Sequence, residues 1–198
     1  MKHVTRTFLA LIAGLLLAPS VVRAQAGAAT RSRAQASAVT TVIIVRHAEK
    51  AAEPKADPPL DSAGQARAQA LAAALRDAGV TAIVTTQFER TKATARPLAE
   101  RLGITPEVVT AGGGSVAEHA KAVAAAVMQH AGGVVLVVGH SNTVPDIVEA
   151  LGAHRPADIC DAEYDNLFVV RVPASGPASV VHARYGTATP VAAGCRGM

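Results

Sequence analysis

The sequence contains no tryptophan, and aromatic residues make up only 3% of its 198 positions. Half of the residues are hydrophobic, so the core must be built mainly from alanine, valine and leucine. Charged residues account for 17%, and lysines and arginines do not cluster into a basic stripe. Because nucleic-acid-binding proteins carry such a stripe, the sequence does not predict a nucleic-acid partner.

Cysteine is also rare, with only Cys160 and Cys195 in the whole chain. These two residues lie far apart and lack the Cys-x-x-Cys spacing of thiolate metal sites, so a metal role is poorly supported. In an oxidising compartment, an isolated pair of this kind is more often bridged than catalytic. We therefore expect a disulfide, which would stabilise the fold by roughly 3 kcal/mol in the chain-entropy model.

Long apolar runs are absent except at the N-terminus, where residues 8–18 form an apolar segment too short to span a bilayer comfortably. Basic residues precede this segment, and Val22-Arg23-Ala24 fits the small-residue rule for cleavage. This pattern predicts a signal peptide over residues 1–24, with Gln25 as the mature N-terminus; the alternative is an uncleaved anchor helix. Export implies a periplasmic or secreted protein with no stable membrane anchor after cleavage.

Cleavage would also change the charge of the chain. It removes Lys2, Arg6 and Arg23 and no acidic residue, so the formal net charge falls from +4 to +1. The high pI of the full sequence is therefore due mostly to the basic residues of the signal peptide. Residues 25–38 are rich in Ala, Gln, Ser and Arg and predict a disordered linker, and residues 39–198 are the length of one domain.

Within that domain, short β-branched runs alternate with longer runs rich in Ala and Leu. The runs predict strands over residues 40–45, 81–85, 107–110, 134–138, 167–172 and 179–185. They predict helices over residues 62–77, 87–102, 116–130 and 144–151, the second with a Thr86-x-x-Glu89 capping box. The last two strands are candidates for a hairpin. This alternation indicates an α/β fold, a three-layer α/β/α sandwich with a mostly parallel central sheet.

Polar side chains follow three of these strands. Arg46 and His47 end the first strand, Thr85-Thr86 leads from the second to Arg90, and His140 follows the fourth. The carboxyl ends of parallel strands meet at one edge of a sheet, which is where ligands bind in open α/β folds. Two guanidinium groups, two imidazoles and a helix N-terminus suit a dianion, of which phosphate is the obvious candidate.

The same residues carry a family resemblance. The motifs Arg46-His47-Ala48-Glu49, Leu60-Asp61, Gly64-Gln65, Gln69-Ala70, Arg90-Thr91, Thr94-Ala95, Pro97-Leu98-Ala99 and Gly139-His140 occur in this order. Together they resemble the histidine phosphatase superfamily, also called phosphoglycerate-mutase-like, over nearly the whole domain. Residues 139–143 and 164–168 are similar to small exported bacterial members, some of which act on lipopolysaccharide sugar phosphates.

The resemblance implies a phosphomonoesterase in which His47 is the nucleophile and becomes a phosphohistidine. Arg46, Arg90 and His140 would bind the phosphoryl group and stabilise its charge. No metal and no cofactor are implied, and the substrate would be a small-molecule or glycan phosphomonoester. The sequence carries no signal for a particular substrate or for an oligomeric state.

The resemblance also implies an acidic proton donor between the Arg90 helix and the strand before His140. Glu118 is the only acidic residue after Glu107 in that segment, and it is the expected catalytic acid. The alternative is that Glu118 merely begins a helix, where an acidic side chain is favoured in any case. The neighbouring His119 is predicted to be a surface residue, with the alternative that it reaches the pocket.

Two departures from the family pattern bear on function. Ala48 replaces the usual glycine after the histidine, which narrows the backbone conformations available there. Glu53 stands where mutases often have asparagine, which weakens a mutase assignment. Two other functions stay open: a relative that binds phosphate with little turnover, and a metal-dependent hydrolase, although arginines in the pocket oppose a divalent metal.

Overall fold

The computed structural model describes residues 39–190, which form a six-stranded sheet and four helices. The strands are β1 (Thr40–Arg46), β2 (Ala82–Thr85), β3 (Glu107–Val108), β4 (Val134–Gly139), β5 (Asn166–Val172) and β6 (Ser179–Arg184). The helices are α2 (Ser62–Ala74), α3 (Glu89–Leu102), α4 (Val116–Met128) and α5 (Val144–Ala150). The expected signal peptide, the linker and Cys195 lie outside the described residues, so those predictions stay predictions.

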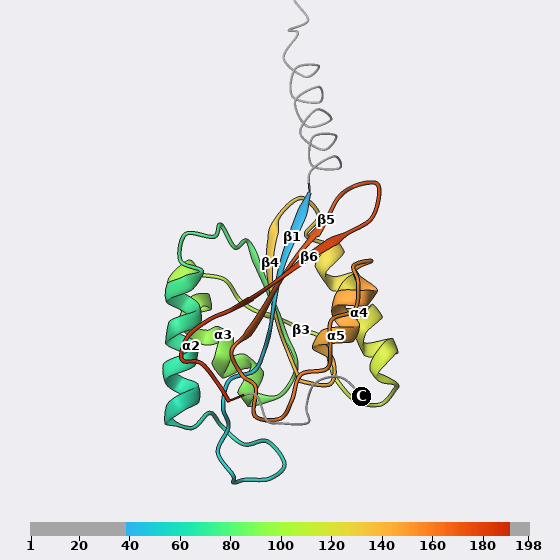
Figure 1. Cartoon of the computed structure of the whole chain (residues 1–198). Coiled ribbons are helices and arrows are strands. Elements are labelled where there is room, and N and C mark those ends of the chain that lie inside the picture. The colour runs from blue at the N-terminus through green and yellow to red at the C-terminus, as the bar shows by residue number, and fades with distance from the viewer. Residues whose placement is uncertain (1–38, 191–198) are drawn as a thin grey trace, which may run out of the picture. The chain divides into compact units, whose positions relative to one another are not determined.

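The strand order in the sheet is β3-β2-β4-β1-β5-β6. Strands β1 to β4 pair in parallel, whereas β5 pairs antiparallel with both β1 and β6. The hairpin expected for the last two strands is therefore confirmed, and so is the mostly parallel sheet. In Figure 1 the parallel strands run downward, so their carboxyl ends gather at the bottom of the sheet.

Helices cover both faces of the sheet, α2 and α3 on one side and α4 and α5 on the other (Figure 1). The alternation of side chains along β1 explains these two layers, because successive residues of a strand point to opposite faces. Val42 and Ile44 pack in a core with residues of α4 and α5, whereas Ile43 and Val45 pack with residues of α2 and α3. A strand that is apolar on both faces thus requires a three-layer fold, and the predicted α/β/α sandwich is confirmed.

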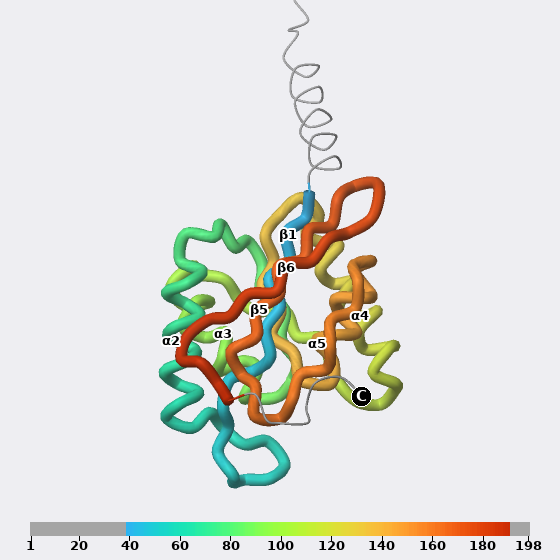
Figure 2. The backbone as a smooth tube through the Cα atoms, in the orientation of Figure 1, coloured from blue at the N-terminus to red at the C-terminus, as the bar shows by residue number. Residues whose placement is uncertain are grey.

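The N-terminus of α3 differs from the prediction. The expected Thr86–Glu89 capping box is wrong: the helix begins after Phe88, which makes no side-chain cap. The carboxylate of Asp57 accepts the backbone N–H of Glu89 instead, at 3.0 and 3.1 Å from its two oxygens. Sequence patterns find caps that are local in the chain, and Asp57 lies in a distant loop, seen in Figure 2 in the cyan part of the tube before α2.

The start of α2 packs tightly against the segment that follows His47. Asp61 caps the helix by accepting the backbone N–H of Gly64 at 2.8 Å. A Cβ atom at Gly64 would lie 2.0 Å from the carbonyl oxygen of Glu49, so only glycine fits there. The glycine therefore lets α2 support the backbone next to the predicted nucleophile.

Within residues 39–190, no helix combines the length and the apolar character needed to span a bilayer. Cys160 is buried, with 5% of its surface exposed. The predicted disulfide with Cys195 stays a prediction, since Cys195 is outside the described residues.

Candidate active site

A pocket of about 450 Å³ lies where the parallel strands end. Four of the predicted site residues line it, namely Arg46, His47, Arg90 and His140. The rest of the lining is formed mainly by Lys50, Phe88, residues of the 111–116 segment, His119, residues 141–143 and Asp161. The structure thus brings together side chains from β1, the start of α3, the start of α4 and the end of β4.

The His47 ring is fixed in one orientation. Its Nδ1 lies 2.8 Å from the carbonyl oxygen of Ala48, and because a carbonyl can only accept, Nδ1 carries the proton. In the neutral ring this leaves the lone pair on Nε2. Burial, followed by the nearby charges of Arg46 and Arg90, lowers the pKa of His47 to about 4. His47 is therefore neutral at neutral pH and can act as a nucleophile.

His140 lies next to His47, with 5.3 Å between the two ring centroids. Its Nε2 is 3.1 Å from the Thr86 hydroxyl, which is in turn 3.0 Å from the Thr91 hydroxyl. Burial, followed by the interaction with the neighbouring His47 and the charge of Arg90, lowers the pKa of His140 to about 3. The ring is thus neutral and is held by a pair of threonines from the segment that joins β2 to α3.

Arg46 is anchored by the loop before β5. Its Nη1 donates to the carbonyl oxygens of Cys160, Asp161 and Glu163 at 2.8 to 2.9 Å, and its guanidinium lies 4.0 Å above the centre of the Tyr164 ring. The Nε atom is buried without a hydrogen-bond partner among the described residues. Burial lowers the pKa of Arg46, but an arginine stays charged in proteins. One part of the guanidinium is therefore structural, and an unpaired donor is left over.

Arg90 reaches the pocket from the first turn of α3. Its Nη1 lies 3.5 Å from an oxygen of Asp57, and its guanidinium lies 4.2 Å above the Phe88 ring. Burial lowers its pKa, which the charge of Asp57 partly offsets. The Nε of Arg90 is also buried without a partner among residues 39–190. Both arginines thus hold a buried donor that an anion in the pocket could satisfy.

Ala48, which replaces the glycine expected there, introduces no backbone strain, because no non-glycine residue of the described chain has a positive φ. Its side chain is completely buried and packs with Leu60 and Ala68. Its backbone N–H donates to the Thr94 hydroxyl at 2.9 Å. That hydroxyl donates in turn to the carbonyl oxygen of Arg90 at 2.7 Å, so a single threonine couples the backbone after His47 to the backbone at Arg90.

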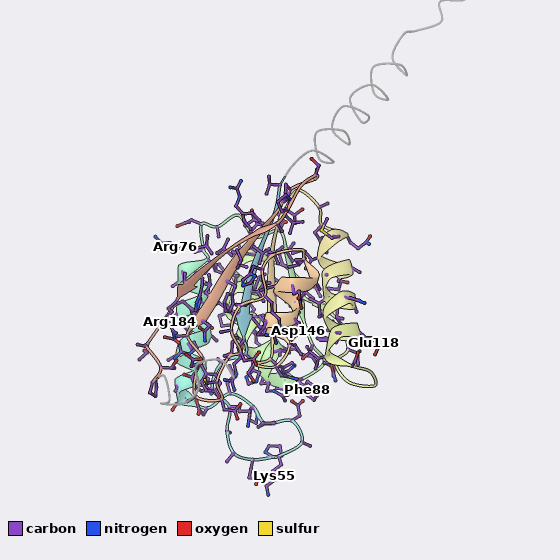
Figure 3. All side chains as sticks on the ribbon, turned by 45° about the vertical axis from the view of Figure 1, so that its right-hand side comes forward. Lys55, Arg76, Phe88, Glu118, Asp146 and Arg184 are labelled. Atoms are coloured by element: carbon purple, nitrogen blue, oxygen red, sulfur yellow. The ribbon has the colours of Figure 1, made fainter. Side chains whose placement is uncertain are left out.

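The structure does not bring Glu118 into the pocket with the other predicted residues. Its carboxylate accepts the backbone N–H of Ser115 at 2.7 Å and the Ser115 hydroxyl at 3.0 Å, forming a capping box at the start of α4. These hydrogen bonds lower the pKa of Glu118. Its side chain is exposed at the outer edge of α4 (Figure 3). This arrangement matches the alternative interpretation, in which Glu118 starts a helix.

Two aromatic side chains at the site were not expected to function there from the sequence. Phe88, labelled in Figure 3, packs edge-on against His140 at 5.5 Å between ring centroids and lies under Arg90. Tyr164 supports Arg46 in the same way. Because the chain has so few aromatic residues, their positions near the ends of strands were the one sequence signal that could have pointed to Phe88 and Tyr164. His119 is buried rather than exposed and lines the pocket.

Comparison with known proteins supports the family resemblance. The model of the histidine phosphatase superfamily (branch 1) matches residues 42–111, which include the Arg46-His47 and Arg90 motifs. No curated protein matches the sequence significantly.

Solved structures of this superfamily share the fold. The protein histidine phosphatase SixA complexed with tungstate is 18% identical, with a TM-score of 0.57 over 73% of this chain and 96% of that chain. A phosphoglycerate mutase from Bacillus anthracis str. Sterne is 17% identical, with a TM-score of 0.55 over 76% and 95%. A mycobacterial glucosyl-3-phosphoglycerate phosphatase is 14% identical, with a TM-score of 0.54 over 74% and 98%. The fold is therefore phosphoglycerate-mutase-like.

Proposed function

We propose that this protein is a phosphatase that hydrolyses phosphomonoesters through a phosphohistidine on His47, without a metal. The observation that carries the proposal is the state of His47 in the pocket. The ring is buried, uncharged and oriented by the Ala48 carbonyl, which leaves the Nε2 lone pair available for attack on phosphorus. The superfamily match covers this residue and Arg90.

The first step transfers the phosphoryl group to His47. The Nε2 lone pair forms a bond to phosphorus while the bond to the leaving oxygen breaks, with negative charge spread over three phosphoryl oxygens. Arg46 and Arg90 stabilise that charge through their unpaired guanidinium donors, and His140 lies beside the attacking ring. In the second step, water attacks the phosphohistidine and releases inorganic phosphate.

The substrate presents a phosphate dianion on a small molecule or a glycan. The names of the structural neighbours include a protein histidine phosphatase and a sugar phosphoglycerate phosphatase, so phosphorylated proteins and sugar phosphates are the substrate classes to compare. Export to the periplasm or the medium belongs to the same proposal and rests on the sequence of residues 1–24.

A second candidate function is a protein that binds phosphate with little turnover. The position of Glu118 favours it, because the expected acid is tied into the α4 cap and does not line the pocket. Formation of a covalent phosphoenzyme would distinguish a phosphatase from a protein that only binds phosphate.

The test is hydrolysis of 4-nitrophenyl phosphate with a chelator present, together with acid-labile phosphate bound to the protein after a rapid quench. We expect wild type to turn over and to trap phosphate, and His47→Ala to do neither. His154→Ala, at an exposed histidine, is the matched control and should behave as wild type. Full activity in His47→Ala, or activity only with added metal, would refute the proposal. Phosphate binding without turnover would establish the second candidate.

A further inference from the structure

The pocket holds a third histidine that the proposed mechanism does not yet use. His119 lies in the second turn of α4, one residue after the cap formed by Glu118. Its side chain lines the same pocket as His47 and His140. Only 8% of its surface is exposed. The ring is thus part of the wall around the place where phosphate would bind.

Both ring nitrogens of His119 are buried without a hydrogen-bond partner among the described residues. Buried polar atoms are nearly always hydrogen-bonded in native proteins, so an unpartnered pair of nitrogens needs an explanation. His47 and His140 each have a partner that fixes one nitrogen, the Ala48 carbonyl and the Thr86 hydroxyl respectively. His119 alone among these three rings has no such anchor, which points to a partner supplied by a ligand.

Ester hydrolysis also requires an acid in the pocket, and residues 39–190 offer few candidates for it. A leaving alkoxide must receive a proton, and the same group later accepts one from the attacking water. Asp161 is the one carboxylate among the described residues that line the pocket. Its side chain is exposed, and its charge faces Arg46, whose Nη1 donates to the Asp161 backbone carbonyl. Glu118 is held in the α4 cap.

We propose that His119 is the catalytic acid and base of this pocket and that the substrates are therefore phosphate esters. The proposal rests on the phosphatase function proposed above. Imidazole suits both roles because it changes protonation near neutral pH.

Hydrolysis proceeds in two steps, and His119 moves a proton in each. The His47 Nε2 lone pair forms the N–P bond, and the P–O ester bond breaks with its electron pair going to the leaving oxygen. The His119 imidazolium gives its proton to that oxygen, and the alcohol leaves. Neutral His119 then takes a proton from water as the water oxygen attacks phosphorus. The N–P bond breaks with its electron pair returning to His47, and phosphate leaves from an enzyme in which His119 is again protonated.

The test compares two aryl phosphates that differ in how much they need the acid. Phenolate is a poor leaving group and needs a proton, whereas 4-nitrophenolate leaves readily without one. For His119→Asn we expect kcat/KM, which reports the transfer to His47, to fall about a hundredfold on phenyl phosphate, as for loss of a general acid, and less than about tenfold on 4-nitrophenyl phosphate. His119→Leu removes the buried polar atoms, keeps comparable volume, and should show the same selectivity. Circular dichroism of both variants verifies that the fold is intact.

Matched variants make the outcome decisive. Glu118→Gln and Asp161→Asn should retain the wild-type ratio of kcat/KM between phenyl phosphate and 4-nitrophenyl phosphate, and His154→Asn controls for the substitution itself. An equal loss of kcat/KM on both esters in the His119 variants would make the ring a binding group and overturn the proposal. A loss selective for phenyl phosphate in Glu118→Gln or Asp161→Asn would overturn it as well. If wild type forms no phosphohistidine, the proposed phosphatase function fails; if it does, these ratios test His119 alone.

Discussion

Acidification should destabilise this protein through His47, and the size of the effect follows from the structure. The buried ring has a pKa of about 4 in the folded protein, against about 6.5 in the unfolded chain. Between these two values the unfolded state binds more protons than the folded state, so the free energy of unfolding falls as pH falls. The contribution is fully present above pH 6.5 and is lost on the way down to about pH 4.

At pH 5 this difference in proton binding corresponds to about 2 kcal/mol, and by pH 4 to about 3 kcal/mol. Other groups titrate over the same range, so the effect must be isolated with a variant that lacks only this ring. Urea unfolding of wild type and His47→Gln at pH 7.5 and pH 5 does so. We expect wild type to lose about 2 kcal/mol more than His47→Gln between the two pH values.

The exposed His154 supplies the control. His154→Gln should follow the wild-type pH dependence. If His47→Gln loses as much stability as wild type on acidification, His47 is not held neutral by burial, and the argument that it is a ready nucleophile at neutral pH fails with it.

Three further predictions concern the framework of the pocket. Gly64→Ala places a Cβ 2.0 Å from the Glu49 carbonyl oxygen and should lower the free energy of unfolding by about 1 to 3 kcal/mol; an unchanged melting temperature would contradict the close approach. Thr86→Val removes the hydroxyl at His140 Nε2 and should reduce kcat about tenfold, as for loss of one buried hydrogen bond. The circular dichroism spectrum should be normal, and an unchanged kcat would show that the threonine does not position the ring. Arg67 is 4% exposed and pairs with Glu49 at 2.7 Å, so Glu49→Gln leaves an unpaired buried charge and should lower the free energy of unfolding in urea by about 3 to 5 kcal/mol. A loss below about 0.5 kcal/mol would mean that the Tyr185 and Thr187 carbonyls, which also accept from Arg67, are enough to stabilise its charge.

The four predicted residues that line the pocket could be found from the sequence because their positions follow from strand ends. Arg46 and His47 end β1, and His140 follows β4, its parallel neighbour in the sheet. A parallel sheet places such residues side by side whatever the details of packing. Arg90 follows from the same rule, since it opens the helix after β2, which also pairs with β4. The order of motifs was enough to anticipate this half of the pocket.

The other half depends on contacts between distant segments. Asp57 caps α3 from a loop 32 residues earlier in the chain, and the carbonyls of residues 160, 161 and 163 hold Arg46 from more than 110 residues away. No local sequence pattern predicts such long-range partners. The predicted Thr86–Glu89 capping box was wrong for this reason, because tertiary contacts assigned Thr86 to His140 and gave the cap to Asp57.

The sequence by itself determined the α/β/α layers and the edge of the sheet where the site lies, since both follow from hydrophobic periodicity and from the residues that end strands. Only the tertiary structure decided between Glu118 and His119 as pocket residues. The two are adjacent, and successive residues of a helix point about 100° apart. One turns outward into the cap of α4, and the other turns inward to the pocket. The direction of α4 relative to the sheet sets that difference, and packing in the core fixes that direction.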